Sequence, residues 1–162
     1  MAATPGTSSW TMAGIDTAVQ LTGGVLVGDD GSPTATRALR YAVEEAARRG
    51  VAVHAVRAWT IPTAVRPPDA PFGTTPSVVE LQDATAAEVR RRLAEAIGDR
   101  DDVTGEAHAV HGRPDRVLIA AAEHADVLVV GTRGRSKIGT LLVGSIAAAC
   151  IREAPVPVIV AR

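Results

Sequence analysis

"VLVGDDGSPTATRALRYAVEEAARRGVAVHAVRAW", residues 25–59, contains the signals of a complete strand–helix–strand unit. The "VLVG" run at 25–28 is short, apolar and ended by glycine, which is the pattern of a strand covered on both faces. Ser32 and Pro33 are typical of the start of a helix, and a glycine follows its last turn. "VAVHAVRAW" at 51–59 is rich in valine and predicts the next strand. The stretch therefore predicts a β-α-β unit of a parallel sheet.

The remainder of the chain repeats this alternation. After a proline-rich loop at 60–76, helix signals begin near Ser77, where a capping box with Glu80 is expected, and near Pro114. We further expect strands at 103–110, 126–130 and 156–161 and a last helix at 140–153. The order β-α-β-α-β-α-β-α-β predicts a single-domain α/β fold with helices on both faces of a parallel sheet. Pro157 removes a hydrogen-bond donor from the last strand, which predicts an edge position.

Composition excludes several classes of protein. Seventeen basic and eighteen acidic residues give a net charge of −1, which disfavours nucleic acid as a partner. No window approaches the length of apolar sequence that spans a membrane, so we expect no membrane association. A single cysteine, Cys150, rules out an internal disulfide framework and favours the cytoplasm. Residues 1–22 carry no signal-peptide pattern and are expected to form a flexible tail ahead of one domain at 23–162.

The glycine-rich stretch "GTRGRSKIGTLLVGS" follows the strand at 126–130 and occupies residues 131–145. Ligands of open α/β sheets bind beyond the carboxyl ends of the strands, so this stretch lies at the end where a ligand is expected. Gly131 and Gly134 would let backbone N–H groups approach an anion closely. Gly144 and Ser145 lie at or within the first turns of the last helix, whose N-terminus favours phosphate. The stretch predicts a phosphate-binding loop.

Two familiar phosphate motifs do not account for it. "GTLLVGS" at 139–145 has the glycine spacing of a P-loop but places Ser145 where the lysine should be. The dinucleotide fingerprint is absent after the first strand, where the chain reads "VGDDGS". The loop also carries three cations: Arg133, Arg135 and Lys137. They would either screen the phosphate charge or point into water, and the sequence leaves both possibilities open.

The spacing G-x2-G-x9-G-[ST] at residues 131–145 resembles that of the ATP-binding subclass of the universal stress protein family. The similarity extends over residues 24–162, through "VLVGDDGS", "AARRGVAVHAVRAW" and the C-terminal "GTRGRSKIGTLLVGSIAAACIREAPVPVIVAR". The resemblance implies a Rossmann-like, five-stranded parallel sheet in the order 3-2-1-4-5, with ATP across strands one and four. It also implies homodimerisation through the last strand, 156–161.

The resemblance assigns roles to individual residues. Asp30 would bond the adenine or ribose, and Val130 would pack beneath the base or sugar. Backbone groups would line the pocket at three further positions: Gly28, Asp29 and Ala58. The phosphates would be held by Gly131, Gly134, Gly144 and Ser145. On this basis, Gly131→Val or Gly144→Val is expected to abolish ATP binding and leave the fold intact.

The residues themselves support part of this assignment. An ionised carboxylate at Asp30 suits a ribose hydroxyl, because it accepts two hydrogen bonds, and a turn or helix-capping aspartate is the alternative. The chain departs from the family by carrying Asp29 and Arg57, where an apolar residue or threonine and a histidine are common. The Asp29–Asp30 pair would either bind Mg²⁺ or Mn²⁺ together with phosphate or repel the nucleotide, and both readings stay open.

Polar residues elsewhere predict little chemistry. The chain has four histidines, and their spacing is not that of metal ligands: His54, His108, His111 and His124. His54 is expected to be an ordinary strand residue. The charged face of the second helix is expected to be solvated: Glu88, Arg90, Arg91, Arg92 and Glu95. No nucleophile–histidine–acid arrangement stands out.

Three functions follow from these observations. The leading hypothesis is a cytoplasmic, homodimeric, ATP-binding stress-response protein that acts through regulatory protein partners and binds its nucleotide without rapid catalysis. The first alternative is a weak ATPase or phosphoryl-transfer enzyme, for which no base that would orient the nucleophile is evident. The second is a nucleotide-free interaction module that uses the loop at 60–76 and the dimer surface.

Overall fold

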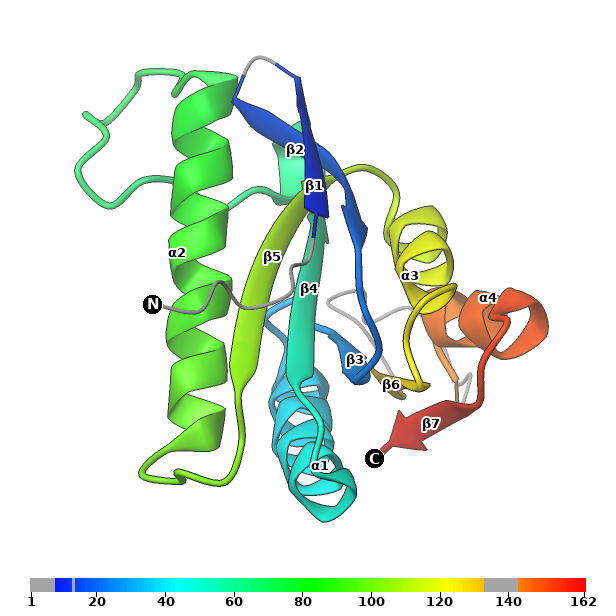
Figure 1. Ribbon diagram of the computed structural model, residues 1–162. Coiled ribbons are helices and arrows are strands. Elements are labelled where there is room, and N and C mark those ends of the chain that lie inside the picture. The colour runs from blue at the N-terminus through cyan, green and yellow to red at the C-terminus, as the bar shows by residue number, and fades with distance from the viewer. Residues whose placement is uncertain (1–7, 13, 133–142) are drawn as a thin grey trace.

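A five-stranded parallel sheet forms the centre of the molecule in a computed structural model that describes residues 8–12, 14–132 and 143–162 (Figure 1). The strands lie in the order β5-β4-β3-β6-β7. Counted along the chain within this sheet, that is the expected order 3-2-1-4-5. Their bounds are Val25–Gly28 for β3, Val53–Trp59 for β4, Gly105–His111 for β5, Val127–Gly131 for β6 and Val158–Ala161 for β7.

Helices cover both faces of the sheet (Figure 1). Helices α1 (Pro33–Arg49) and α2 (Val78–Ile97) pack on one face, and α3 (Pro114–Ala122) and α4 (Ser145–Glu153) on the other. A short 3₁₀ helix, η1 (Ile61–Thr63), lies in the proline-rich loop. The single-domain α/β architecture is therefore confirmed.

Local signals determine the helix ends. The Ser32 hydroxyl accepts a hydrogen bond of 3.1 Å from Ala35 N, which satisfies one of the free donors at the start of α1. Gly50 ends the helix with a φ of +65°, a conformation that glycine adopts without strain. Ser77 and Glu80 form the expected capping box at the start of α2.

The core divides into two layers because side chains alternate along each strand. Val25, Val27 and Val129 contact α1 and α2, whereas Leu26 and Leu128 contact the layer of α3 and α4. The apolar runs that predicted buried strands are thus buried on both faces, as parallel sheets require.

The N-terminal region differs from the expected flexible tail over the part that the structure describes. Strands β1 (Ser8–Met12) and β2 (Ile15–Gln20) form an antiparallel hairpin that crosses in front of β4 and β5 in Figure 1. Val19 and Leu21 are buried in the same core cluster as α3. The tail prediction was wrong there because a short strand gains its stability from packing against β5, which its own sequence does not reveal.

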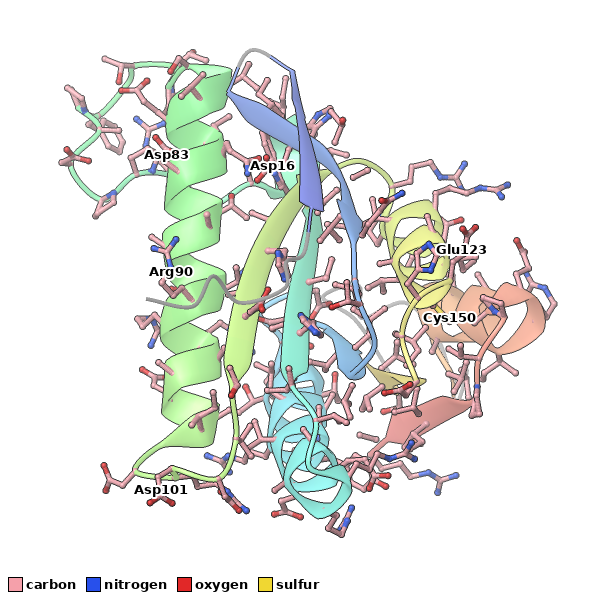
Figure 2. All side chains as sticks on the ribbon, in the orientation of Figure 1. Asp16, Asp83, Arg90, Asp101, Glu123 and Cys150 are labelled. Atoms are coloured by element: carbon pink, nitrogen blue, oxygen red, sulfur yellow. The ribbon has the colours of Figure 1, made fainter. Side chains whose placement is uncertain are left out.

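Smaller differences concern element ends. The last helix begins at Ser145 in the described residues, and positions 140–142 of the expected helix lie outside them. Strand β7 is an edge strand, as expected. Pro157 precedes it, and the Pro157 carbonyl accepts a hydrogen bond from Leu128 N. Cys150 of α4, labelled in Figure 2, is fully buried, and this burial raises the pKa of its thiol to about 11. No helix among the described residues is long and apolar enough to cross a membrane.

Candidate functional site

The carboxyl ends of β3, β4 and β6 meet at one edge of the sheet. Between β3 and β6 the direction of winding reverses, because β3 leads through α1 to β4 on one side while β6 and β7 extend the sheet on the other. Such a switch point is where open α/β sheets bind ligands. Most of the expected site residues belong to the described part of the chain, and these lie at this edge or just beyond it.

The turn after β3 is held by its own polar groups. Asp29 N donates a hydrogen bond of 3.0 Å to Val56 O, which extends the pairing with β4 by one residue. Asp30 Oδ1 accepts a bond of 3.0 Å from Ser32 N, so Asp30 shapes the turn that leads into α1. Asp30 is part-exposed, and it has the role of a turn aspartate that the sequence analysis gave as the alternative.

Asp29 has a role that the sequence did not predict. Its carboxylate accepts hydrogen bonds from Arg92 of α2, at 2.8 Å from Nε to Oδ2 and 2.9 Å from Nη2 to Oδ1. Gly31 N donates to the same carboxylate at 3.0 Å. The Asp29 side chain is fully buried and that of Arg92 is 12% exposed, so this is a buried, bidentate ion pair.

This ion pair corrects two expectations. Arg92 does not belong to a solvated face of α2, although its neighbour Arg91 pairs with Glu88 and Glu95 at the surface. The pKa of Arg92 is raised, chiefly by its hydrogen bonds to Asp29. A metal ion held jointly by Asp29 and Asp30 would have to displace Arg92. Repulsion of a nucleotide by Asp29 is also reduced, because Arg92 compensates its charge.

Three further residues of the expected site lie at or near the carboxyl ends of β3, β4 and β6. Gly28 lies against α3, and a Cβ there would come within 2.8 Å of Leu118 Cδ1. Val130 is buried in the core beside α3 and α4, so its side chain packs there. Ala58, on β4 opposite Val110 of β5, is part-exposed at the expected end of its strand.

Gly131 contacts the first turn of α1. A Cβ at this position would lie 3.1 Å from both the carbonyl carbon and Oγ1 of Thr34. A side chain at this position would therefore crowd Thr34, whether or not a ligand is bound. Gly131→Val would therefore strain the packing of β6 on α1 as well as change the expected site.

Gly144 and Ser145 form the start of α4. Gly144 N donates a hydrogen bond of 2.7 Å to Thr132 O, which places the start of α4 beside the end of β6. Gly144 is the N-cap, and its backbone angles of −70° and 162° are open to any residue. It makes no side-chain cap, and Ser145 is exposed. Among the described residues, no side chain caps the first N–H groups of α4, where an anion could bind.

The rest of the expected phosphate loop lies outside the described residues. That part includes Gly134 and the three cations Arg133, Arg135 and Lys137. The hydrogen bond between Thr132 and Gly144 nevertheless joins the two ends of this segment.

Comparison with known proteins identifies the relatives of the chain. Residues 23–162 match the sequence model of the Universal stress protein family. The chain belongs to the universal stress protein family. Universal stress protein Rv2005c of Mycobacterium tuberculosis is 39% identical over 138 residues, which cover 85% of this chain and 45% of that protein. This universal stress protein chain thus spans less than half the length of the curated relatives it matches.

Solved structures of the family share the fold. The universal stress protein UspA of Lactobacillus plantarum is similar with a TM-score of 0.66 and 25% identity, over 88% of this chain and 99% of that one. A universal stress protein in complex with cAMP matches at a TM-score of 0.60 and 26% identity, over 87% and 97% of the chains. A protein of Archaeoglobus fulgidus in complex with dAMP matches at 0.56 and 25%, over 86% and 97%. The last two of these relatives are complexes with adenine nucleotides.

Arg92 and Thr34 are the residues that sequence reasoning missed. Thr34 follows the N-cap closely and carries no signal of contact with β6. Arg92 lies 63 residues from Asp29 in the chain, among charged neighbours of the same type. Its only distinguishing feature is its position on the face of α2 that also buries Val89 and Leu93.

Proposed function

We propose that this universal stress protein binds ATP at the carboxyl edge of its sheet and acts in the cytoplasm as a homodimer that signals nucleotide state to protein partners. The phosphates would contact the start of α4, at Gly144 and Ser145, together with Gly134. Asp30 would bond the ribose or adenine, with Ala58 and the Gly28–Asp29 backbone around the base. Binding, rather than rapid catalysis, would be the main activity.

The observation that carries this proposal is the position of the α4 N-terminus. The bond from Gly144 N to Thr132 O holds this uncapped terminus against the end of β6, one strand from the Asp29–Asp30 turn. A nucleotide could thus reach helix N–H groups with its phosphates and the carboxylate of Asp30 with its sugar. The relatives in complex with cAMP and dAMP support an adenine ligand.

The first experiment is chemical extraction of the purified protein, followed by mass spectrometry of the released small molecules. Copurified ATP would support the proposal directly. Thermal unfolding with added ATP, ADP, AMP, cAMP and dAMP then ranks the nucleotides, because a ligand that binds only the folded state must raise the melting temperature.

Gly144→Val is the sharper test of the site than Gly131→Val. The backbone at Gly144 suits any residue, whereas a side chain at Gly131 meets Thr34. We expect Gly144→Val and Ser145→Ala to weaken ATP binding, by about tenfold or more for the valine, which corresponds to roughly 1.4 kcal/mol. Arg90→Ala, an exposed change on α2 (Figure 2), is the control. Wild-type affinity in both site variants would refute this phosphate site.

A further inference from the structure

Two histidines and a glutamate converge on the face of the sheet that carries the N-terminal hairpin. In the register of β4 and β5, His54 pairs with Glu106 and Val56 with His108, so all three side chains project from the same face. Glu106 Oε2 lies 3.8 Å from both His54 Nδ1 and His108 Nε2. One ligand atom from each residue lies within 4.8 Å of the other two.

The two ring nitrogens that face Glu106 are buried. His54 Nδ1 and His108 Nε2 have no hydrogen-bond partner among the described residues. The His54 side chain is only 5% exposed, and a buried polar atom without a partner is costly. Such an atom indicates that something outside the described chain completes its interactions.

The surroundings of His54 favour the form of the ring in which Nδ1 carries a lone pair and Nε2 carries the proton. The backbone of Gly23 hydrogen-bonds to this ring, and because Nδ1 has no partner, that bond falls on Nε2. A ring whose far nitrogen is held by the backbone presents its other nitrogen in a fixed orientation. Metal-binding histidines are commonly held in this way.

Burial favours the uncharged form of both imidazoles in the cluster. Burial lowers the pKa of His54, and it lowers the pKa of His108 to about 4. The neutral imidazole that burial favours is the form that coordinates metals. Glu106 contributes an anionic oxygen, and Asp16 of β2 lies near enough to act on the His108 ring electrostatically.

We propose that His54, Glu106 and His108 bind a divalent transition-metal ion, for which Zn²⁺ is the best fit, with water in the remaining position. Two imidazoles and one carboxylate form a mixed N/O set of the kind that zinc accepts in four-coordinate sites. Ca²⁺ and Mg²⁺ are disfavoured, because they prefer sites made of oxygen ligands.

Binding would draw the three side chains together. Zinc bonds of about 2.0–2.1 Å place tetrahedral ligand atoms roughly 3.3 Å apart. The distances of 3.8 Å from Glu106 to each ring require small changes, and the two rings have further to move. The rings already lie nearly parallel, with centroids 5.8 Å apart and 29° between their planes. Closing the site would therefore require rotation of the side chains.

The proposed metal site is separate from the nucleotide site. His54 and Glu106 are the second residues of their strands, whereas the nucleotide is expected at the carboxyl ends. Hairpin strand β2 lies against β5 on this face and contributes to the cover. The metal would therefore tie β4 and β5 together beneath the hairpin, whether or not ATP binds.

Zinc titration of untagged, chelator-stripped full-length protein tests the proposal. We expect a single zinc per chain that survives gel filtration, measured by plasma mass spectrometry, and a rise in melting temperature with zinc. Cobalt should give the intense visible absorption of a tetrahedral site. Glu106→Gln should weaken zinc binding by more than the roughly 10–100-fold that loss of an outer-shell partner costs.

Matched variants separate metal binding from packing. His124→Ala removes an exposed imidazole outside the cluster and should bind zinc as the wild type does. His108→Leu should lose the zinc and its stabilising effect. If that variant does not fold, Glu106→Gln decides, since it keeps the shape of the side chain and its metal-free melting can be compared with the wild type. Failure of the wild type to retain zinc, or equal binding by Glu106→Gln, would overturn the proposal.

Discussion

Asp29 shows how one side chain can change the reading of a site. In the sequence it is a second carboxylate beside Asp30, and metal binding or charge repulsion were the two interpretations. In the fold its carboxylate is buried against Arg92 and Gly31 N. Asp29 therefore anchors α2 to the turn after β3, and the nucleotide would meet a charge that is already paired.

Removing Arg92 should test this role. Arg92→Ala leaves the Asp29 carboxylate buried and unpaired, so we expect a loss of about 3 kcal/mol in the free energy of unfolding. Arg91→Ala is the control on the same helix, because its ion pairs are exposed and should contribute much less to the free energy of unfolding. Urea unfolding of both variants measures the difference. Equal losses would show that the buried pair has no special role.

The N-terminal hairpin is the element whose role only the structure reveals. Strand β2 lies against β5 and α3, and it covers the side of the sheet that carries the histidine cluster. Val19 is buried in the core from this strand, whereas Thr17 is exposed. The hairpin is therefore part of the domain's core and not an appendage.

Val19→Ala should destabilise the protein by about 2 kcal/mol, since it removes two buried methyl groups and leaves a small cavity. Thr17→Ala on the same strand should cost less, because this side chain is exposed. Thermal and urea unfolding measure both changes. A loss at Val19 no larger than that at Thr17 would mean that the hairpin does not contribute to the core.

At the scale of the whole molecule, the open edge of β7 is the surface proposed for the dimer. Pro157 and Ala161 turn their carbonyls toward β6, where they accept hydrogen bonds from Leu128 N and Thr132 N. Because backbone groups alternate along a strand, the N–H groups of Val158 and Val160 point away from β6. These groups are the ones that a second copy would pair with.

Val160→Pro should remove one of these outward donors and leave the ladder with β6 unbroken. We expect the mass measured by light scattering to fall to about half that of a dimeric wild type. Val160→Ala keeps the N–H group and should remain dimeric. A Val160→Pro variant that still dimerises would place the interface elsewhere, and a monomeric wild type would remove the dimer from the proposed function.

The sequence by itself determined the order of elements in the sheet domain and most of their ends. Strand β3, the capped starts of α1 and α2, and Pro33 and Pro114 at helix starts could be predicted because they depend on neighbours in the chain. The spacing of glycines at 131–145 likewise indicated the family, and the match of residues 23–162 to the family's sequence model confirms it.

Only the tertiary structure decided which distant groups meet. The pairing of Asp29 with Arg92, the packing of Gly131 on Thr34 and the placing of His54 beside His108 depend on strand register and helix position. Histidines that had no metal-ligand spacing along the chain became neighbours through β4–β5 pairing. Local sequence determines backbone conformation, but contacts between distant residues arise only when the whole core packs, and that packing sets the chemistry of both proposed sites.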